Sequence, residues 1–335
     1  MSAPLPPPLL SVEGLSIAFG ARRGRGRIEV TRDVSFRIGK GERVGLVGES
    51  GCGKTVTGLS LMGLLPHGAR ASGRIVLDGE DLVSASEARL RAIRGGRIAM
   101  IFQEPMSALD PVFTVGAQIA EALRLHREVD RAEERDRVIE ALREVGIPAP
   151  EKRVDDYPHQ LSGGMRQRVC IAMALVCRPE LIIADEPTTA LDVTIQAQVT
   201  DLLRKLSEDT GTALLFITHD LGVVAETCTR MITMYAGEVV EDAPVDEALM
   251  RPRHPYTSGL LRALPQIGRR RRGEFAFIPG RVPAPTQMPE GCRFRPRCTH
   301  AAEGCERAQA LAPVDAQRRV RCGRAEALEL PGATA

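Results

Sequence analysis

Apolar residues in the first hundred positions fall into short runs separated by Gly-rich turns. Alternation at every second position is typical of a strand with one buried face, and a short continuous apolar run is typical of a fully buried strand. A spacing of three and four predicts a helix instead. These patterns predict a helix over 54–65 and strands at 11–19, 28–38, 43–47, 74–77 and 97–102.

The pattern becomes mainly helical between about 104 and 178, after which strands return. The later segments are predicted as a strand at 181–184, a helix at 194–209, a strand at 213–217 and a β-rich segment at 230–241. Strands that alternate with helices favour a parallel α/β core. We therefore predict an α/β fold with a helical segment inserted into its core.

The composition changes after about residue 250. One short helical stretch follows, and residues 279–296 are rich in Pro and Arg. We expect residues 251–335 to form a small extension that is held together by something other than a large apolar core.

Charge and composition argue against some classes of function. The 335 residues carry 45 Lys and Arg against 43 Asp and Glu, whereas a chain that coats nucleic acid usually has a strong basic excess. Aromatic residues make up only 3%, which argues against a stacking platform for single-stranded bases, so no nucleic-acid partner is expected. The sequence has neither an apolar run long enough to span a membrane nor a secretory signal, so we expect an intracellular protein.

A phosphate-binding pattern follows the predicted strand 43–47 and precedes the predicted helix. It fits G-x-x-x-x-G-K-[ST], in which backbone N–H groups cradle phosphates, the Lys supplies a positive charge and the final hydroxyl binds Mg²⁺. Its residues are Gly48, Glu49, Ser50, Gly51, Cys52, Gly53, Lys54 and Thr55.

Two carboxylates end the buried run at 181–184. Ligand sites in open α/β sheets lie at the carboxyl ends of strands. We expect Asp185 to hold Mg²⁺ through water and Glu186 to act as the general base toward the attacking water.

Three further motifs point to a family. Leu161 to Met165 reads LSGGM, Gln103 closes the predicted strand RIAMIFQ, and His219 ends LLFITH. In this order the motifs resemble those of the nucleotide-binding subunit of ATP-binding cassette (ABC) transporters, over about residues 10–250. The resemblance implies a P-loop ABC nucleotide-binding domain with a helical subdomain at about 104–178 and an antiparallel β subdomain.

The resemblance also implies roles for single residues. Phe19 is similar to the aromatic that stacks on adenine, and Gln103 to the residue that touches Mg²⁺ and couples to the membrane partner. His219 matches the histidine that contacts the γ-phosphate. In this family each site is shared, because the signature of the second subunit closes over the ATP of the first. That signature corresponds to Ser162, Gly163 and Gly164, with Met165 in place of the more usual Gln.

Each of these motifs also has a plainer interpretation. Phe19 could be a core aromatic, His219 a structural histidine, and Ser162 simply the N-cap of a helix. Their joint order favours the ATPase.

The extension resembles that of a subfamily. RHPYT at 253–257, IPG at 278–280 and GCRFRPRC at 291–298 are similar to the C-terminal extension of oligopeptide/dipeptide/nickel importer ATPases. The resemblance implies an ATPase that powers peptide import from the cytoplasmic face of the inner (plasma) membrane. Its implied partners are a second, related ATPase, two permeases and an extracytoplasmic solute-binding protein.

Four cysteines near the end have the spacing C-x5-C-x6-C-x16-C: Cys292, Cys298, Cys305 and Cys322. Four convergent thiolates can bind a metal centre, although this spacing is not that of common zinc sites or ferredoxins. Similar importer ATPases carry a [4Fe-4S] cluster at such a quartet, which is the leading interpretation. Zn²⁺ at the same ligands and free thiols are the alternatives. We expect Arg293, Arg295 and Arg297 to offset the charge of a bound cluster.

Two other functions stay open at this point. A nickel or other small-solute importer would use the same kind of ATPase. A non-transport ABC ATPase of DNA repair or of scaffold type belongs to a different class, and it is disfavoured because no heptad insert separates the P-loop from the signature.

Overall fold

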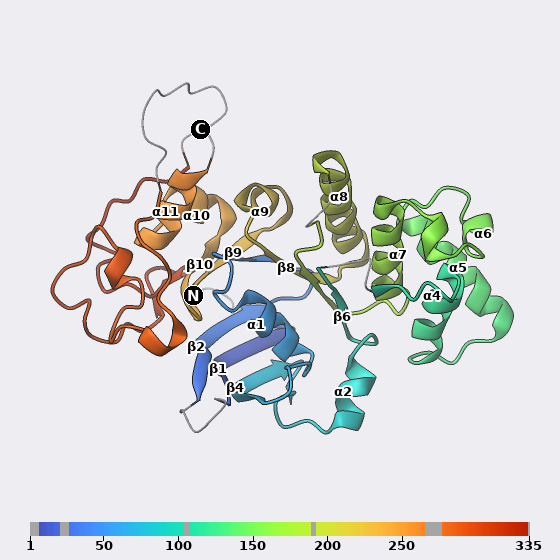
Figure 1. Cartoon of the computed structure of the whole chain (residues 1–335), viewed down its shortest axis with the longest axis horizontal. Coiled ribbons are helices and arrows are strands. Elements are labelled where there is room, and N and C mark those ends of the chain that lie inside the picture. Colours follow the sequence, from blue (N-terminus) through green and yellow to red (C-terminus); the bar gives the residue numbers. More distant parts are fainter. Residues whose placement is uncertain (1–6, 21–26, 104–107, 189–191, 265–276, 334–335) are drawn as a thin grey trace. The chain divides into compact units, whose positions relative to one another are not determined.

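The computed structural model describes residues 7–20, 27–103, 108–188, 192–264 and 277–333 (Figure 1). The chain divides into two compact units. The first unit contains Gly39–Arg43 and Ser84–Ile217, and the second contains Pro7–Ile38, Val44–Val83 and the chain from Thr218 onward. Among the described residues, no helix combines the length and the apolar character that a membrane crossing needs.

The first unit has a parallel sheet at its centre. Strand β6 (Ile98–Ile101) pairs with β7 (Leu181–Asp185), and β7 pairs with β8 (Ala213–Thr218). Every residue of β7 and β8 is buried, as expected for parallel strands that are covered on both faces. The predicted α/β core is confirmed here.

Helices make up most of the rest of the first unit. Four of them, α4 to α7, gather into one helical part (Figure 1). Each of α2, α4, α5, α7 and α8 begins at a Ser, Thr or Asp whose side chain accepts a backbone N–H, which explains where these helices start. The bounds are α2 Glu87–Ile93, α4 Val115–Arg124, α5 Arg131–Glu144, α6 Pro150–Arg153, 3₁₀ helix η2 Pro158–Gln160, α7 Gly163–Leu175 and α8 Val193–Thr210.

The second unit contains the predicted antiparallel sheet, in the order β2-β1-β4-β5. Its strands are β1 Leu10–Phe19, β2 Ile28–Ile38, β4 Ala69–Leu77 and β5 Glu80–Asp81. The unit also pairs β3 (Arg43–Val47) in parallel with β9 (Arg230–Tyr235), which forms a hairpin with β10 (Glu238–Pro244). The helices of this unit are α1 Lys54–Leu61, α9 Leu221–Thr227, α10 Val245–Met250 and α11 Pro255–Ala263.

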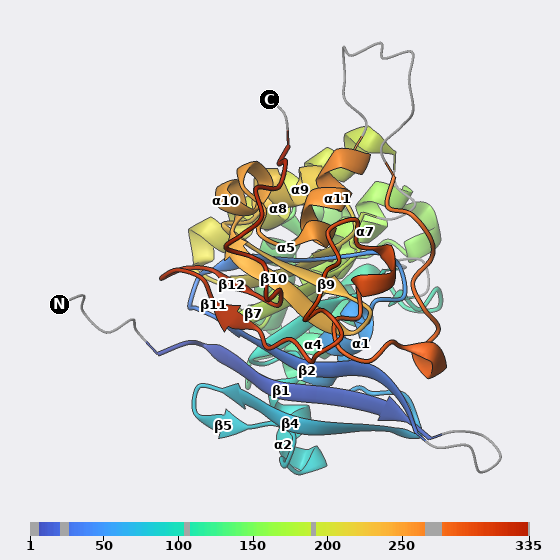
Figure 2. The same ribbon diagram turned by 90° about the vertical axis from the view of Figure 1, so that its left-hand side faces the viewer.

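The C-terminal extension packs on this second unit. Strand β12 (Arg319–Val320) pairs with β10 and with β11 (Ala312–Pro313), so the extension runs beside the β9–β10 hairpin (Figure 2). An aromatic cluster joins the two, because the ring of Phe294 lies 5.1 Å from that of Tyr235 and 5.4 Å from that of Tyr256. The extension also contains 3₁₀ helices η3 (Pro285–Gln287) and η4 (Arg295–Arg297). We expected something other than a large apolar core to hold the extension, and the structure shows that a small shared cluster contributes: Tyr235, Tyr256 and Phe294 pack together where the extension meets the hairpin.

Candidate active site

The predicted phosphate loop lies between β3 and α1 in the second unit. Gly48, Gly51 and Gly53 all have positive φ angles, of 154°, 78° and 102°, which favour glycine. A Cβ at Gly48 would lie 2.2 Å from the Met234 carbonyl oxygen, so this position admits only glycine. A Cβ at Gly51 would meet nothing within 4 Å, so the top of the loop is open. The loop therefore requires glycine for its backbone conformation at these positions and, at Gly48, for close packing as well.

Helix α1 supplies the charge of the cradle. It begins after Gly53, which has a left-handed backbone conformation and provides no side-chain cap. The first turn of the helix holds no acidic residue. The N–H groups of such a helix end are suited to an anion. Lys54 is buried, and its Nζ donates to the carbonyl oxygens of Gly48 (2.7 Å) and Glu49 (3.2 Å). The loop thus folds around the ammonium group, while Ser50 and Thr55 are exposed.

The predicted acidic pair lies in the first unit, at the end of β7. Asp185 is buried, and Glu186 has φ 44°, an uncommon angle for a residue with a side chain. Gln103 Nε2 donates a 3.1 Å hydrogen bond to Glu186 Oε2. Two residues that the sequence places 83 positions apart are therefore in contact. The predicted Mg²⁺ donors, the Asp185 carboxylate and the Thr55 hydroxyl, are oxygen ligands of the kind that this ion prefers.

The predicted signature forms the start of α7. Ser162 is exposed, and its Oγ accepts the N–H of Met165 at 3.3 Å, so the N-cap interpretation is correct for the structure described. A Cβ at Gly163 would meet nothing within 4 Å, so this helix end is also open. No motif in the sequence points to Gln167, which is fully buried and whose Nε2 donates to the Pro187 carbonyl oxygen at 2.7 Å. That bond joins the signature helix to the loop after Glu186.

Two further residues that are predicted to contact the nucleotide belong to the second unit, and each lies at or next to the end of a strand. Phe19 is half-buried at the end of β1, and His219 is exposed directly after β8. Asp220 caps α9 by accepting the N–H groups of Gly222 and Val223, which fixes the backbone next to His219. The residues of the predicted ATP site are thus divided between the two units.

The four clustered cysteines line one cavity, together with His254 and His300. Burial raises the pKa of the Cys292 thiol to about 11, and it raises the pKa values of Cys298 and Cys322 as well. Over the described ranges, however, no three His, Cys, Asp or Glu side chains are arranged to hold a metal ion. The four thiols line one cavity, but the described residues show no metal site there, whether for Zn²⁺ or for a cluster.

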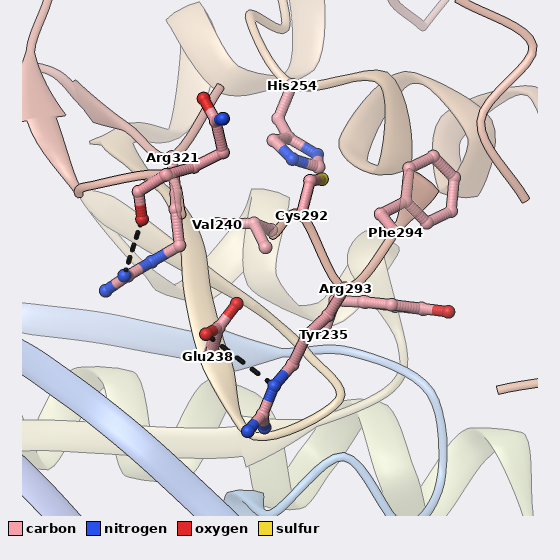
Figure 3. Close-up of a pocket in the computed structure, with 9 residues that line it drawn as sticks. Tyr235, Glu238, Val240, His254, Cys292, Arg293, Phe294 and Arg321 are labelled. Atoms are coloured by element: carbon pink, nitrogen blue, oxygen red, sulfur yellow. Dashed lines mark hydrogen bonds and ion pairs between the residues drawn. The ribbon is translucent and has the colours of Figure 1, made fainter. Parts of the chain in front are cut away.

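The arginines near the cysteines contact carboxylates rather than the cavity alone. Figure 3 shows Arg293 pointing toward Glu238, with its Nε 3.6 Å from the carboxylate, and Arg293 also contacts Glu29. Arg297 binds the Glu49 carboxylate with both terminal nitrogens. Each of these two arginines therefore has an acidic partner, which leaves less of its positive charge to offset that of a cluster.

Two contacts of the phosphate loop escaped the sequence analysis. The Glu49 N–H donates to the Tyr256 hydroxyl at 2.9 Å, and the Glu49 carboxylate binds Arg297. Both partners lie in motifs that were noted only as marks of a subfamily, RHPYT and GCRFRPRC. No local signal links them to residue 49.

Comparisons with known proteins agree with this geometry. The ABC transporter family matches residues 31–189, and the family "Oligopeptide/dipeptide transporter, C-terminal region" matches residues 240–305. A "Putative peptide import ATP-binding protein" of Brucella ovis is 50% identical over 328 residues, covering 94% of this chain and 96% of that one. A "Probable peptide ABC transporter ATP-binding protein" of Sinorhizobium fredii is 50% identical over 305 residues, covering 89% and 91%.

Solved structures support the fold. The ATP-binding cassette MJ0796 in a dimeric post-hydrolysis state bound to ADP and Pi aligns with a TM-score of 0.62 at 28% identity, covering 70% of this chain and 98% of that one. The cassette cbiO1 of Clostridium perfringens, part of the cbiONQ transporter complex, aligns with a TM-score of 0.60 at 28% identity, covering 72% and 90%. Sequence, fold and site agree: this chain belongs to the ABC transporter family, as an ATP-binding protein with the C-terminal region of the oligopeptide/dipeptide transporters.

Proposed function

We propose that this ATPase powers the import of di- and oligopeptides through a membrane ABC transporter. The observation that carries the proposal is the match over most of the chain to relatives named for peptide import, which includes the C-terminal region as well as the cassette. Import of nickel or another small solute by the same kind of machine is the alternative outcome of the tests below.

Each predicted site residue has a role in this proposal. Lys54 and the N–H groups of the phosphate loop bind the β- and γ-phosphates, and Glu186 polarises the attacking water while Gln103 holds its carboxylate. Thr55, Asp185 and Gln103 would hold Mg²⁺, which would supply positive charge next to the phosphates. Phe19 stacks on adenine, and His219 contacts the γ-phosphate.

A second ATPase subunit completes the site. The open N-terminus of α7 presents exposed Ser162 and Gly163, followed by Gly164, and this supports a signature that binds the γ-phosphate of a partner chain. ATP then holds two subunits together, and hydrolysis releases them. We propose a related but non-identical partner, so that the pair is a heterodimer.

A permease would dock near Gln103. Three exposed apolar residues of the first unit lie close to Gln103 in the sequence. Phe102 directly precedes Gln103, and Val112 and Phe113 precede α4. Exposed apolar side chains of this size are typical of interaction sites. We propose that they receive cytoplasmic loops of two permeases, which places the chain peripherally on the cytoplasmic face of the inner membrane with a solute-binding protein on the other side.

For the extension we propose in addition a [4Fe-4S] cluster held by four cysteines: Cys292, Cys298, Cys305 and Cys322. One observation supports it: all four thiols line one cavity. Such a cluster would be held by the four thiolates. Its role here is structural, tying together the loops of the extension.

Co-isolation from membranes tests the assembly. The tagged chain is recovered from gently solubilised membranes, and its partners are identified. The proposal predicts two permeases and a second ATPase. Phe113→Glu should lose the permeases, whereas the same change at Phe277, a still more exposed apolar residue of the extension, should keep them. Recovery with DNA-processing proteins, or with no partner, would contradict the proposal.

A further inference from the structure

The extension contacts the phosphate loop at Glu49, the residue that follows the first glycine of the loop. Arg297 donates to both carboxylate oxygens of Glu49, at 2.7 Å and 3.0 Å, and the Glu49 backbone N–H donates to the Tyr256 hydroxyl at 2.9 Å. Glu49 is separated from these partners by more than 200 residues of sequence. The extension therefore binds both the backbone N–H and the side-chain carboxylate of Glu49.

The side chains of Arg297 and Tyr256 are themselves held in place by their surroundings. The Arg297 side chain is 4% exposed, its Nε donates to the Pro279 carbonyl oxygen at 2.9 Å, and its guanidinium lies 5.7 Å from the centre of the Tyr235 ring. Tyr256 is fully buried, with its ring 4.7 Å from that of Tyr235. A buried two-bond contact to a carboxylate has one geometry, so Glu49 has little freedom to turn.

A carboxylate at this position is a problem for a phosphate site. Glu49 lies inside the loop whose N–H groups and Lys54 would receive the phosphates, and a negative side chain there repels a polyphosphate. An unpaired carboxylate would also attract the Lys54 ammonium group, which contacts the backbone of the same residue at the Glu49 carbonyl oxygen (3.2 Å). The Arg297 guanidinium neutralises the carboxylate and holds it against the extension.

We propose that Arg297 and Tyr256 are positioning residues for ATP: Arg297 keeps the Glu49 carboxylate away from the phosphates and from Lys54, and Tyr256 fixes the Glu49 peptide within the cradle. Neither side chain is required to touch the nucleotide. The extension is then a working part of the ATP site of its own chain, whatever solute the transporter carries.

The test compares ATP affinity and turnover in the full-length chain. Arg297→Met keeps the length of the side chain but removes its charge. We expect its KM and Kd for MgATP to rise about tenfold, with kcat changed less than about twofold, because the loss is in phosphate binding rather than in chemistry. Tyr256→Phe keeps the ring and should raise KM about threefold.

Rescue separates this role from a merely structural one. Adding Glu49→Gln to Arg297→Met removes the unpaired carboxylate, so the double variant should recover an ATP affinity within about threefold of the parent. Arg318→Met is the matched control, because Arg318 is an equally buried arginine of the extension (5% exposed) whose partner is Glu247, outside the loop. It should leave KM unchanged.

Two results would overturn the proposal. One is a double variant with the same weakened affinity as Arg297→Met, and the other is an equal loss in Arg318→Met. If Arg297→Met does not fold, as judged by its melting curve, Arg297→Lys takes its place: it keeps the charge but cannot form the two-bond contact. Its smaller rise in KM must likewise disappear when Glu49→Gln is added.

Discussion

The Gln103 amide donates a 3.1 Å hydrogen bond to the Glu186 carboxylate. Gln103 follows β6 and Glu186 follows β7, and these two strands are paired in parallel, so the same edge of the sheet positions both side chains. Glu186 also keeps a positive φ of 44°, with its N–H bonded to the Ile217 carbonyl oxygen at 2.8 Å. The carboxylate of the proposed base is thus oriented from two neighbouring strands.

This relationship predicts the effect of Gln103→Ala. Without the amide, the Glu186 carboxylate loses one partner that orients it, and we expect kcat for ATP hydrolysis to fall about tenfold while KM for ATP changes little. Steady-state kinetics of the purified chain measure both constants. A loss confined to KM would contradict the assignment, since it would place Gln103 in ATP binding alone.

Substitution in the phosphate loop should depend on what the new Cβ meets. In Gly48→Ala the Cβ would lie 2.2 Å from the Met234 carbonyl oxygen, so we expect the free energy of unfolding to fall by about 3 kcal/mol or more. Gly51→Ala adds a Cβ to open space and bears only the backbone strain, about 1 kcal/mol. Denaturant unfolding compares the two, and equal destabilisation would refute the close approach at Gly48.

An ion pair at the base of β7 should make stability depend on pH. Arg97 donates two hydrogen bonds to Glu180, at 2.5 Å and 3.0 Å, and these bonds hold the pKa of that carboxyl below its usual value. Since the folded-state pKa is the lower one, the stabilisation is present above the usual glutamate pKa of about 4.3 and is lost as pH falls through the folded value.

Glu180→Gln tests this pair. The carboxylate is partly exposed, so we expect the variant to lose only about 0.5 kcal/mol of unfolding free energy at pH 7. The difference from the parent protein should shrink as the pH is lowered below about 4. Urea unfolding at both pH values provides the measurement, and a difference that stays constant with pH would exclude the ion pair as its source.

The cysteine quartet gives a prediction about metal content. Anaerobically purified protein should contain about four iron and four sulfide per chain, and Cys298→Ser should lower both. Cys170→Ser is the matched control, because Cys170 lies outside the cavity and burial raises its pKa to about 12. Zinc without iron or sulfide would refute the cluster.

The strands and the site motifs were predictable from sequence wherever the signal is local. The bounds 28–38 and 43–47 match β2 and β3, because polar alternation and the turn at Gly39–Gly41 delimit them. The strand predicted at 74–77 is longer, however, since β4 begins at Ala69 and its exposed first residues pair with β1. Helix α2 was missed because Ile93 is its only buried residue, which leaves no apolar stripe for a pattern to reveal.

Contacts between distant segments were not predictable. The pairing of Arg297 with Glu49 spans 248 residues, and no periodicity or motif encodes which buried arginine meets which carboxylate. The same holds for Gln167, whose bond to Pro187 depends on how α7 packs in the first unit. The sequence therefore predicted the candidate residues of the nucleotide site, whereas the side chains that contact those residues from distant segments required the structure.

Peptide uptake by whole cells tests the central claim most directly. Cells that lack this chain are supplied with the parent protein or with Glu186→Gln, and uptake of a radiolabelled dipeptide and a radiolabelled oligopeptide is measured beside labelled nickel. We expect the parent protein to restore peptide uptake. Glu186→Gln should bind ATP but hydrolyse it at least 100-fold more slowly and restore no uptake. Peptide uptake that is unaffected by loss of the chain, or that Glu186→Gln restores fully, would contradict the account.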